Sequence, residues 1–404
     1  MIQITDKKDC CGCSACSQKC PVQAITMKED LEGFLYPVVE TAKCIHCGIC
    51  EKVCPILNKV EELPFEQDAY VAQLQDRALL ANSTSGGTFS AIAAYVLNKG
   101  GVVFGAAFDE DFTVSHCKIE SISKLNKLRG SKYVQSKIGS CYVQAKEELK
   151  KGKLVLFSGT PCQIEGLLNF VEGTQENLIT VDVVCRAVPS PYILKKYIEY
   201  RKRKFASNIT GFKFRDKRPY GYQMSALSAY SNKKQIYHGD ISIDPYLRAF
   251  FSNICDRPSC YNCAFKKRYR RSDITLWDCL NISEFCEPTA DMKPNLGLNS
   301  VLFHSAKGRK IWKEIQHELL YCKVNADILT GAAKEMTKSV PLNDLRDKFL
   351  EDANNLSPED LFQKYFPKRA KNRVEHFVRT VLARFGITSK VRLFAKKFIK
   401  NYKR

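Results

Sequence analysis

The chain has 404 residues, of which 45% are hydrophobic and 26% are charged, as expected for a globular protein of two or three domains. Its 19 cysteines are unusual, but the chain is too long and the count is odd for a small secreted disulfide scaffold. The N-terminus lacks the apolar segment of a secretory signal, and no apolar run approaches the roughly 18 residues of a membrane span. We therefore expect a cytoplasmic protein, where clustered cysteines indicate metal or redox chemistry.

The net charge of +20 is unevenly distributed along the chain. Residues 364–404 contain 14 Lys or Arg and a single Glu, and they carry +13 of this charge. The preceding 363 residues carry only +7. The basic character therefore belongs to a C-terminal tail and says little about the body of the protein.

Two cysteine runs at the N-terminus have the same spacing. Residues 10–21 (CCGCSACSQKCP) and residues 44–55 (CIHCGICEKVCP) each contain C-x2-C-x2-C-x3-C-P. This is the spacing of bacterial two-cluster ferredoxins, in which the fourth cysteine of each run ligates the other cluster. It predicts a ferredoxin domain over residues 1–58 with two [4Fe–4S] clusters. The predicted ligands are Cys10, Cys13, Cys16 and Cys54 for one cluster and Cys20, Cys44, Cys47 and Cys50 for the other.

Other features of this segment are expected to support the clusters. Structural zinc sites are the alternative use of the two runs, since zinc sites need only pairs of C-x2-C. Cys11 is an extra thiol and is not expected to be a ligand. The FLYPV segment between the runs predicts a small hairpin strand that shields the clusters. Gly12 and Gly48 would let the backbone approach the sulfurs closely.

The rest of the chain predicts a mixed α/β body. Residues 59–67 form a polar linker with a central proline. Strands then alternate with helices through residues 67–150 and 151–330, which we treat as two α/β domains, and residues 209–240 predict antiparallel strands. Residues 331–404 predict a helical C-terminal region that ends in the basic tail. The predicted fold class is thus a multidomain α+β or α/β protein with an N-terminal dicluster ferredoxin domain.

Four more cysteines could form a third metal site. Two of them follow buried strands, at the strand ends where open α/β sheets bind ligands, and the other two form a third C-x2-C pair. Four thiols are enough for a third [4Fe–4S] cluster, although a zinc site or unliganded thiols would also fit the sequence. The four residues are Cys162, Cys185, Cys260 and Cys263.

Six segments of the body resemble the family of coenzyme F420 hydrogenase/dehydrogenase beta subunits, in its form with a fused two-cluster ferredoxin domain. They occur in the order of that family, from about residue 70 to about residue 305: STSGG, LRGSKYVQS, GTPCQ, VDVVCRAVPSP, SCYNCAFK and RRSDITLWD. The resemblance implies an iron–sulfur flavoprotein oxidoreductase that passes electrons between clusters and a flavin, expected to be FAD, and then to an acceptor or substrate. It also suggests a link to surface-polysaccharide metabolism.

The resemblance directs attention to three loops for cofactor binding. The glycine-containing turn before a helix suits a phosphate or a ring carbonyl, and the loop after residue 128 combines cations, a hydroxyl and a glycine, as a pyrophosphate clamp would. A simple helix cap and a solvated basic loop are the alternatives. The predicted cofactor-binding residues are Ser83, Ser85, Gly86, Gly87, Arg129, Gly130, Ser131, Lys132, Tyr133, Gln135, Gly159, Thr160 and Asp278.

One segment departs from the family pattern. Family members usually have Gly-Asp-Phe-Trp-Gly where this chain has residues 277–281, Trp-Asp-Cys-Leu-Asn, so Asp278 remains but both glycines are replaced. Arg186 and Ala187 stand where the family tends to have His and Gly. This departure favours a second hypothesis, an electron-carrier or adaptor subunit of a larger redox complex with no substrate site of its own.

The basic tail predicts two amphipathic helices. The first carries an apolar stripe at helical spacing, formed by Val374, Phe377, Val378, Val381, Leu382 and Phe385. A second helix, capped by Thr388 or Ser389, would present Val391, Phe394, Phe398, Ile399 and Tyr402. We expect residues 368–404 to attach to an anionic membrane surface on its cytoplasmic side, with packing on the body or on a partner as the alternative. No recognised module indicates nucleic-acid binding.

Overall fold

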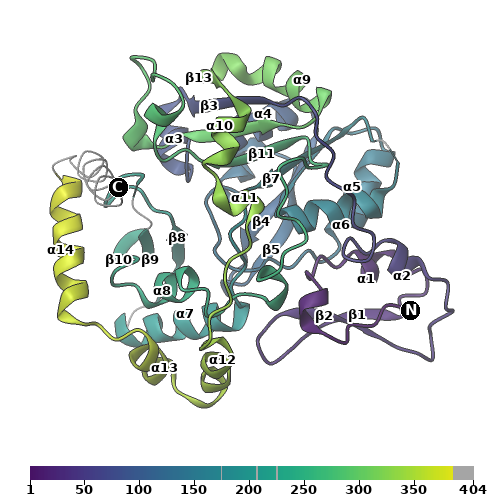
Figure 1. Ribbon diagram of the computed structural model, residues 1–404, viewed down its shortest axis with the longest axis horizontal. Coiled ribbons are helices and arrows are strands. Elements are labelled where there is room, and N and C mark those ends of the chain that lie inside the picture. Colours follow the sequence, from purple (N-terminus) through teal and green to yellow (C-terminus); the bar gives the residue numbers. More distant parts are fainter. Residues whose placement is uncertain (174, 206–207, 224–225, 385–404) are drawn as a thin grey trace, which may run out of the picture.

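The computed structural model describes residues 1–173, 175–205, 208–223 and 226–384. These residues form a small cysteine-rich N-terminal unit, a large mixed α/β body and a helical C-terminal region (Figure 1). The strands of the described residues are arranged in sheets of two, three and eight strands. The predicted fold class, a small ferredoxin-like domain followed by a mixed α/β body, is confirmed.

The N-terminal unit contains two short helices and one hairpin. Helices α1 (Ala15–Lys19) and α2 (Ile49–Lys52) each follow a cysteine loop, and strands β1 (Ile25–Glu29) and β2 (Leu35–Val39) pair antiparallel. The FLYPV segment forms β2, as predicted. Gly12 and Gly48 both have left-handed backbone conformations, with φ of +70° and +72°, which bend the chain ahead of each helix.

The eight-stranded sheet forms the centre of the body. Its strand order is β13-β3-β12-β11-β7-β6-β4-β5, with parallel pairing from β11 through β7 and β6 to β4 and antiparallel pairing at both margins. The division predicted near residue 150 falls between strands of this one sheet. The strands are β3 (Asp68–Leu74), β4 (Val102–Phe108), β5 (Val114–Ile119), β6 (Val155–Gly159), β7 (Leu178–Val183), β11 (Ile274–Asp278), β12 (Asn299–Phe303) and β13 (Leu319–Val324).

Apolar side chains cover both faces of this sheet, because neighbouring strand residues point to opposite sides. On β6, Leu156 packs into the core beneath α4 (Thr88–Asn98) and α9 (Ala306–Ile315). Phe157 points into the opposite core with α5 (Cys141–Lys150) and α6 (Pro161–Val171). That second core also contains Cys13 and Cys16, so the N-terminal unit packs on the face of the sheet covered by α5 and α6. Short helices α3 (Arg77–Asn82), α10 (Ala326–Gly331) and α11 (Lys334–Thr337) complete the body.

A second layer surrounds the three-stranded antiparallel sheet, which confirms the strands expected over residues 209–240. This sheet contains β8 (Gly211–Phe214), β9 (Ala226–Ser231) and β10 (Lys234–Asp240). Helices α7 (Pro191–Phe205), α8 (Pro245–Phe251), α12 (Arg346–Asn355) and α13 (Pro358–Tyr365) pack with it around a shared apolar core. Within that core, Arg201 and Asp244 form a buried ion pair at 2.7 Å.

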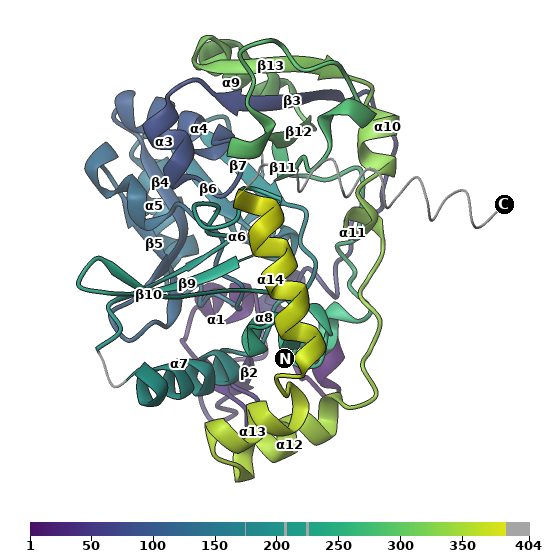
Figure 2. The same ribbon diagram turned by 90° about the vertical axis from the view of Figure 1, so that its left-hand side faces the viewer.

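Helix α14 (Ala370–Arg384) runs along the outside of the three-stranded sheet (Figure 2). It is held by the buried carboxylate of Asp240, which lies 3.3 Å from His376 Nδ1 and 3.8 Å from Arg379 Nη1. The apolar stripe faces away from the described residues, since Phe377 and Val374 are 67% and 62% exposed. The first tail helix is therefore present. The second predicted helix lies outside the described residues.

No helix within the described ranges is long and apolar enough to cross a membrane.

Candidate functional site

The first predicted ligand set lies together in the structure, although Cys54 is distant in sequence from the other three residues. Burial, with the thiols of Cys10 and Cys54 nearby, raises the pKa of Cys16 to about 12. Burial also raises the pKa of Cys54, with Cys10 acting in the same direction. The Gly12 amide donates a hydrogen bond of 3.4 Å to Cys10 Sγ. Buried thiols that resist ionisation alone become thiolates when a cation binds them, so this arrangement fits an iron–sulfur cluster.

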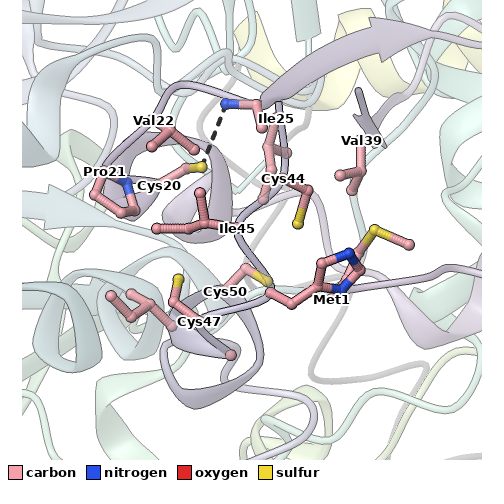
Figure 3. Close-up of a pocket in the computed structure, with 14 residues that line it drawn as sticks. Met1, Cys20, Pro21, Val22, Ile25, Val39, Cys44, Ile45, Cys47 and Cys50 are labelled. Atoms are coloured by element: carbon pink, nitrogen blue, oxygen red, sulfur yellow. Dashed lines mark hydrogen bonds between the residues drawn. The ribbon is translucent and has the colours of Figure 1, made fainter. Parts of the chain in front are cut away.

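The second predicted ligand set lines a hollow near the surface of the N-terminal unit. Figure 3 shows Cys20, Cys44, Cys47 and Cys50 around it, together with Met1. The Ile2 amide donates to Cys50 Sγ and the Ala24 amide donates to Cys20 Sγ, each over 3.3 Å. Hydrogen bonds of this kind tune the reduction potential of a cluster by stabilising negative charge on sulfur. The donors and the four thiols therefore fit a second cluster.

The spacing of these groups bears on the zinc alternative. Within the described ranges, no three His, Cys, Asp or Glu side chains are placed to hold a single metal ion. A zinc ion needs ligands about 2.0–2.3 Å from one point, whereas the ligands of a four-iron cube surround a larger body. The geometry therefore favours clusters over single ions.

The four cysteines of the predicted third site also converge from separate loops. Burial, with Cys162 and Cys263 nearby, raises the pKa of Cys185 to about 12, and burial together with Cys185 raises the pKa of Cys260. The loops are fixed by polar contacts around them. Lys266 Nζ donates to the Cys185 carbonyl over 2.5 Å. The Cys263 amide donates to Ser339 Oγ over 2.9 Å.

A cavity of about 700 Å³ opens beside this third site, at the carboxyl ends of β6 and β7. Cys162 and Cys185 are both part of its wall. All predicted cofactor-binding residues except Gly86 also line it: Ser83, Ser85, Gly87, Arg129, Gly130, Ser131, Lys132, Tyr133, Gln135, Gly159, Thr160 and Asp278. The structure therefore brings together three loops that are far apart in the sequence.

Two residues of the STSGG turn serve the packing of the body. A side chain at Gly86 would come within 2.3 Å of the Ala72 carbonyl oxygen, so this glycine allows β3 and β12 to pack closely. The Ser85 hydroxyl donates to the Leu298 carbonyl over 2.6 Å. The residue between the two predicted serines, Thr84, is the one that joins the loops, because its hydroxyl accepts from the Ser131 amide at 2.9 Å. Sequence reasoning missed Thr84.

Lys132 is the cation of the cavity wall that a phosphate could use. Its Nζ donates to the carbonyls of Lys127 and Arg129 at 3.0 Å each. In the part of the chain that the structure describes, no carboxylate forms an ion pair with it. Burial lowers its pKa to about 7. An anion in the cavity would therefore pair with a partly desolvated, otherwise unpaired amine.

The cavity contains further polar residues that sequence reasoning did not single out. Arg215 forms an ion pair with Asp278 at 2.6 Å, and only the fold brings these two residues together. His116 is buried, and burial lowers its pKa to about 4, so its ring is neutral. Its Nε2 donates to the Ser158 carbonyl and its Nδ1 accepts from the Ser136 hydroxyl, both at 3.0 Å. Asp278 therefore has a partner already, and it is less available to a cofactor than expected.

The N-terminal unit reaches this cavity through Cys11 and Gln135. Gln135 Nε2 donates to the Cys11 carbonyl over 3.0 Å, and the thiols of Cys11 and Cys162 hydrogen-bond to each other. Gly166 in α6 lies directly against Cys13, since an added Cβ would stand 2.9 Å from Cys13 Cβ. The first ligand set, the third cysteine set and the cavity are thus consecutive neighbours.

Comparison with known proteins gives the same two parts. Residues 9–57 match the 4Fe-4S dicluster domain, and residues 152–328 match the family described as the C terminus of the coenzyme F420 hydrogenase/dehydrogenase beta subunit. The chain is 24% identical over 188 residues to the F-type subunit of the F(420)H(2) dehydrogenase of Methanosarcina mazei. That alignment covers 43% of this chain and 51% of the relative, so the chain matches about half the length of that relative.

A solved structure of the F420-reducing [NiFe] hydrogenase complex from Methanosarcina barkeri, derivatised with xenon, is also similar. The match has a TM-score of 0.45 and 16% identity, and it covers 76% of this chain and 94% of that chain. The chain therefore joins a 4Fe–4S dicluster domain to a C-terminal domain of the family of coenzyme F420 hydrogenase/dehydrogenase beta subunits.

Proposed function

We propose that this protein is an iron–sulfur flavoprotein oxidoreductase. Electrons pass between the two ferredoxin clusters, a third [4Fe–4S] cluster held by Cys162, Cys185, Cys260 and Cys263, and FAD bound in the cavity. The observation that carries the proposal is the shared wall: two cysteines of the third set line the cavity that also contains the predicted cofactor loops. A cluster there would lie beside the flavin, as electron transfer requires.

The cavity fits a flavin dinucleotide in size and chemistry. Its volume of about 700 Å³ lies within the range of ligand and cofactor sites. Lys132 and Arg129 would face the pyrophosphate, and the Thr84–Ser131 contact holds their loop against the turn before α4. A bound flavin supplies the step between one-electron and two-electron chemistry. The residues of this chain orient it and exclude water.

Counting electrons tests this function. Anaerobic titration of the fully oxidised chain with dithionite should consume about five electrons, one for each of three clusters and two for the flavin. The adaptor hypothesis, favoured by the replaced glycines of residues 277–281 and by the Arg215–Asp278 pair, predicts about three electrons or fewer and no flavin. Uptake of two electrons with no flavin signal would overturn the flavoprotein proposal and leave a ferredoxin-type carrier.

The ferredoxin clusters can be tested separately. Replacing Cys47 with serine should remove about four irons per chain, because one thiolate of the second cluster is lost. The matched control is Cys322→Ser, which changes a half-buried thiol far along the sequence and should leave the iron content unchanged. Iron and acid-labile sulfide analysis of the two variants checks this. Stoichiometric zinc without sulfide in the parent protein would contradict it.

The electron donor and acceptor are further parts of the proposal. The relative from Methanosarcina mazei is named as a subunit of a dehydrogenase, which supports a redox partner protein for this chain as well as a small-molecule substrate. The link to surface-polysaccharide metabolism rests on the family resemblance alone.

Peripheral membrane attachment through the tail is supported by helix α14. Its polar side binds Asp240 through His376 and Arg379, while Val374 and Phe377 point away from the described body. An exposed apolar stripe beside basic residues suits the interface of an anionic membrane, where each Lys or Arg contributes up to about 1 kcal/mol.

A flotation experiment tests this attachment. Full-length protein should float with liposomes of anionic lipid at low salt, and a chain cut after Pro367 should not, while both keep the same cluster spectrum. The double variant Val374→Ser, Phe377→Ser retains all the charge and should float more weakly than the parent, since the buried apolar area is lost. Failure of the full-length chain to float would contradict membrane attachment.

A further inference from the structure

Arg257 occupies the junction between the ferredoxin unit, the cavity loop and the third cysteine set. It is fully buried and precedes Cys260 by three residues. Its Nε donates to the Cys10 carbonyl over 2.8 Å, and its Nη2 donates to the Leu35 carbonyl over 3.0 Å. Its Nη1 donates to Gln135 Oε1 over 2.8 Å. One side chain therefore connects three segments that are distant in sequence.

These acceptors are all uncharged, which is unusual for a buried cation. Among the described residues, no carboxylate forms an ion pair with Arg257. The other deeply buried arginines do have such partners: Arg201 pairs with Asp244 at 2.7 Å, and Arg346 pairs with Glu32 at 2.5 Å. A buried charge is costly unless an opposite charge accompanies it. The counter-charge of Arg257 must therefore come from something other than a carboxylate.

The groups around Arg257 identify that counter-charge as a thiolate-bound cluster. Burial lowers the pKa of the guanidinium, but Cys10, Tyr36 and then the thiols of Cys11 and Cys260 raise it overall. A [4Fe–4S] cluster with four thiolates has a net charge of about −2 when oxidised and about −3 when reduced. The Tyr36 ring, whose centroid is 4.3 Å from the guanidinium carbon, helps to cover the cation.

The ligand loop itself is shaped around this side chain. A Cβ at Gly12 would stand 2.8 Å from Arg257 Nη1 and 2.8 Å from Gln135 Nε2. The glycine in the first ligand loop therefore leaves space for the cation. Gly48, near the start of the helix in the second loop, has its nearest neighbour at 3.8 Å and faces no arginine. The two ligand loops thus differ at this point, and only the first has a buried positive charge against it.

We propose that Arg257 is the counter-charge of the cluster held by Cys10, Cys13, Cys16 and Cys54, and that it raises the reduction potential of this cluster relative to the second one. Reduction adds one electron to the cluster and no proton, so a fixed positive charge beside it stabilises the reduced form. The inference deepens the proposed function and rests on it for its consequence, which is that electrons entering at the exposed second cluster are drawn toward the body. Arg257 is a positioning residue in this role.

The test is an anaerobic redox titration of the full-length chain and its variants with dithionite, followed by electron paramagnetic resonance. The signal that disappears in Cys47→Ser identifies the second cluster. Arg257→Met should lower the ratio of reduced to oxidised first cluster about tenfold at the midpoint of the parent, which corresponds to a shift of about 59 mV to lower potential. The second cluster should not shift. Arg257→Lys retains the charge and should stay near the parent.

Arg346→Met is the matched control for loosening the domain contact. Arg346 also bridges the body to the ferredoxin unit, through Glu32, but it lies away from the ligand loop and should leave both midpoints unchanged. If Arg257→Met loses its iron, Gln135→Glu provides the same test, because it places a carboxylate beside Nη1 and should lower the first midpoint. An unchanged first midpoint in whichever variant retains iron, or an equal shift of both clusters, would overturn the inference. Absence of flavin or of a third cluster would defeat the proposed function and leave this comparison intact.

Discussion

Replacing Cys260 and Cys263 together with serine is expected to lower the iron content from about twelve to about eight per chain. The two residues form the C-x2-C pair of the third set, and both lie close to Cys185 or Cys162 in the structure. Hydroxyl groups bind iron–sulfur clusters far less well than thiolates, so the third cluster should be lost while the ferredoxin unit is retained. Iron and sulfide analysis after anaerobic purification measures the change.

A control separates ligand loss from general damage in this experiment. Cys117→Ser changes a half-buried thiol in β5 outside all three sets, and it should retain about twelve irons. A parent protein with about eight irons would refute the third cluster directly. Equal iron loss in Cys117→Ser would show that the body unfolds easily, and the assignment of Cys260 and Cys263 as ligands would then fail.

Reversing the charge at Lys132 is expected to weaken FAD binding by tenfold or more. The variant Lys132→Glu places a carboxylate where the cavity wall would meet the pyrophosphate, and like charges in a partly buried site repel strongly. Lys127→Glu makes the same change of charge on an exposed side chain that does not line the cavity, and it should bind normally. Flavin fluorescence during equilibrium dialysis measures both. Unchanged flavin retention in Lys132→Glu would contradict the placement.

The lowered pKa of Lys132 gives FAD binding a pH dependence. Because burial lowers this pKa to about 7, the free protein carries the charge below pH 7 and loses it above. A bound phosphate favours the charged form and raises the pKa, so binding above pH 7 must take up a proton. Affinity should be highest below pH 7 and fall by at most about tenfold per pH unit above it. Lys132→Met should bind more weakly and lose this dependence.

Local spacing is enough to predict the ferredoxin unit and much of the body. The cysteine runs specify their ligand loops within twelve residues each, and the strand periodicity correctly predicts the hairpin and the three-stranded sheet. Residues that act through tertiary contacts are missed. Arg257 lies in a loop that reads as an ordinary basic segment, and only the packing of the ferredoxin unit on α6 reveals its position against Cys10.

The glycines show the same limit from the other direction. The sequence indicates that Gly12 and Gly86 are positions of close approach, but it does not say what approaches them. At Gly12 the neighbour is Arg257, and at Gly86 it is the backbone of β3 and β12. Likewise, the place of Asp278 after a strand predicts a cofactor residue, whereas its carboxylate pairs with Arg215, more than sixty residues away in sequence.

The central claim, that clusters and a flavin occupy one chain, is tested most directly by the composition of the protein isolated without oxygen. Iron, acid-labile sulfide and flavin should be measured on the same sample, with its optical spectrum. The account predicts about twelve irons, about twelve sulfides and one FAD per chain. About eight irons with no flavin, or zinc in place of iron and sulfide, would contradict it.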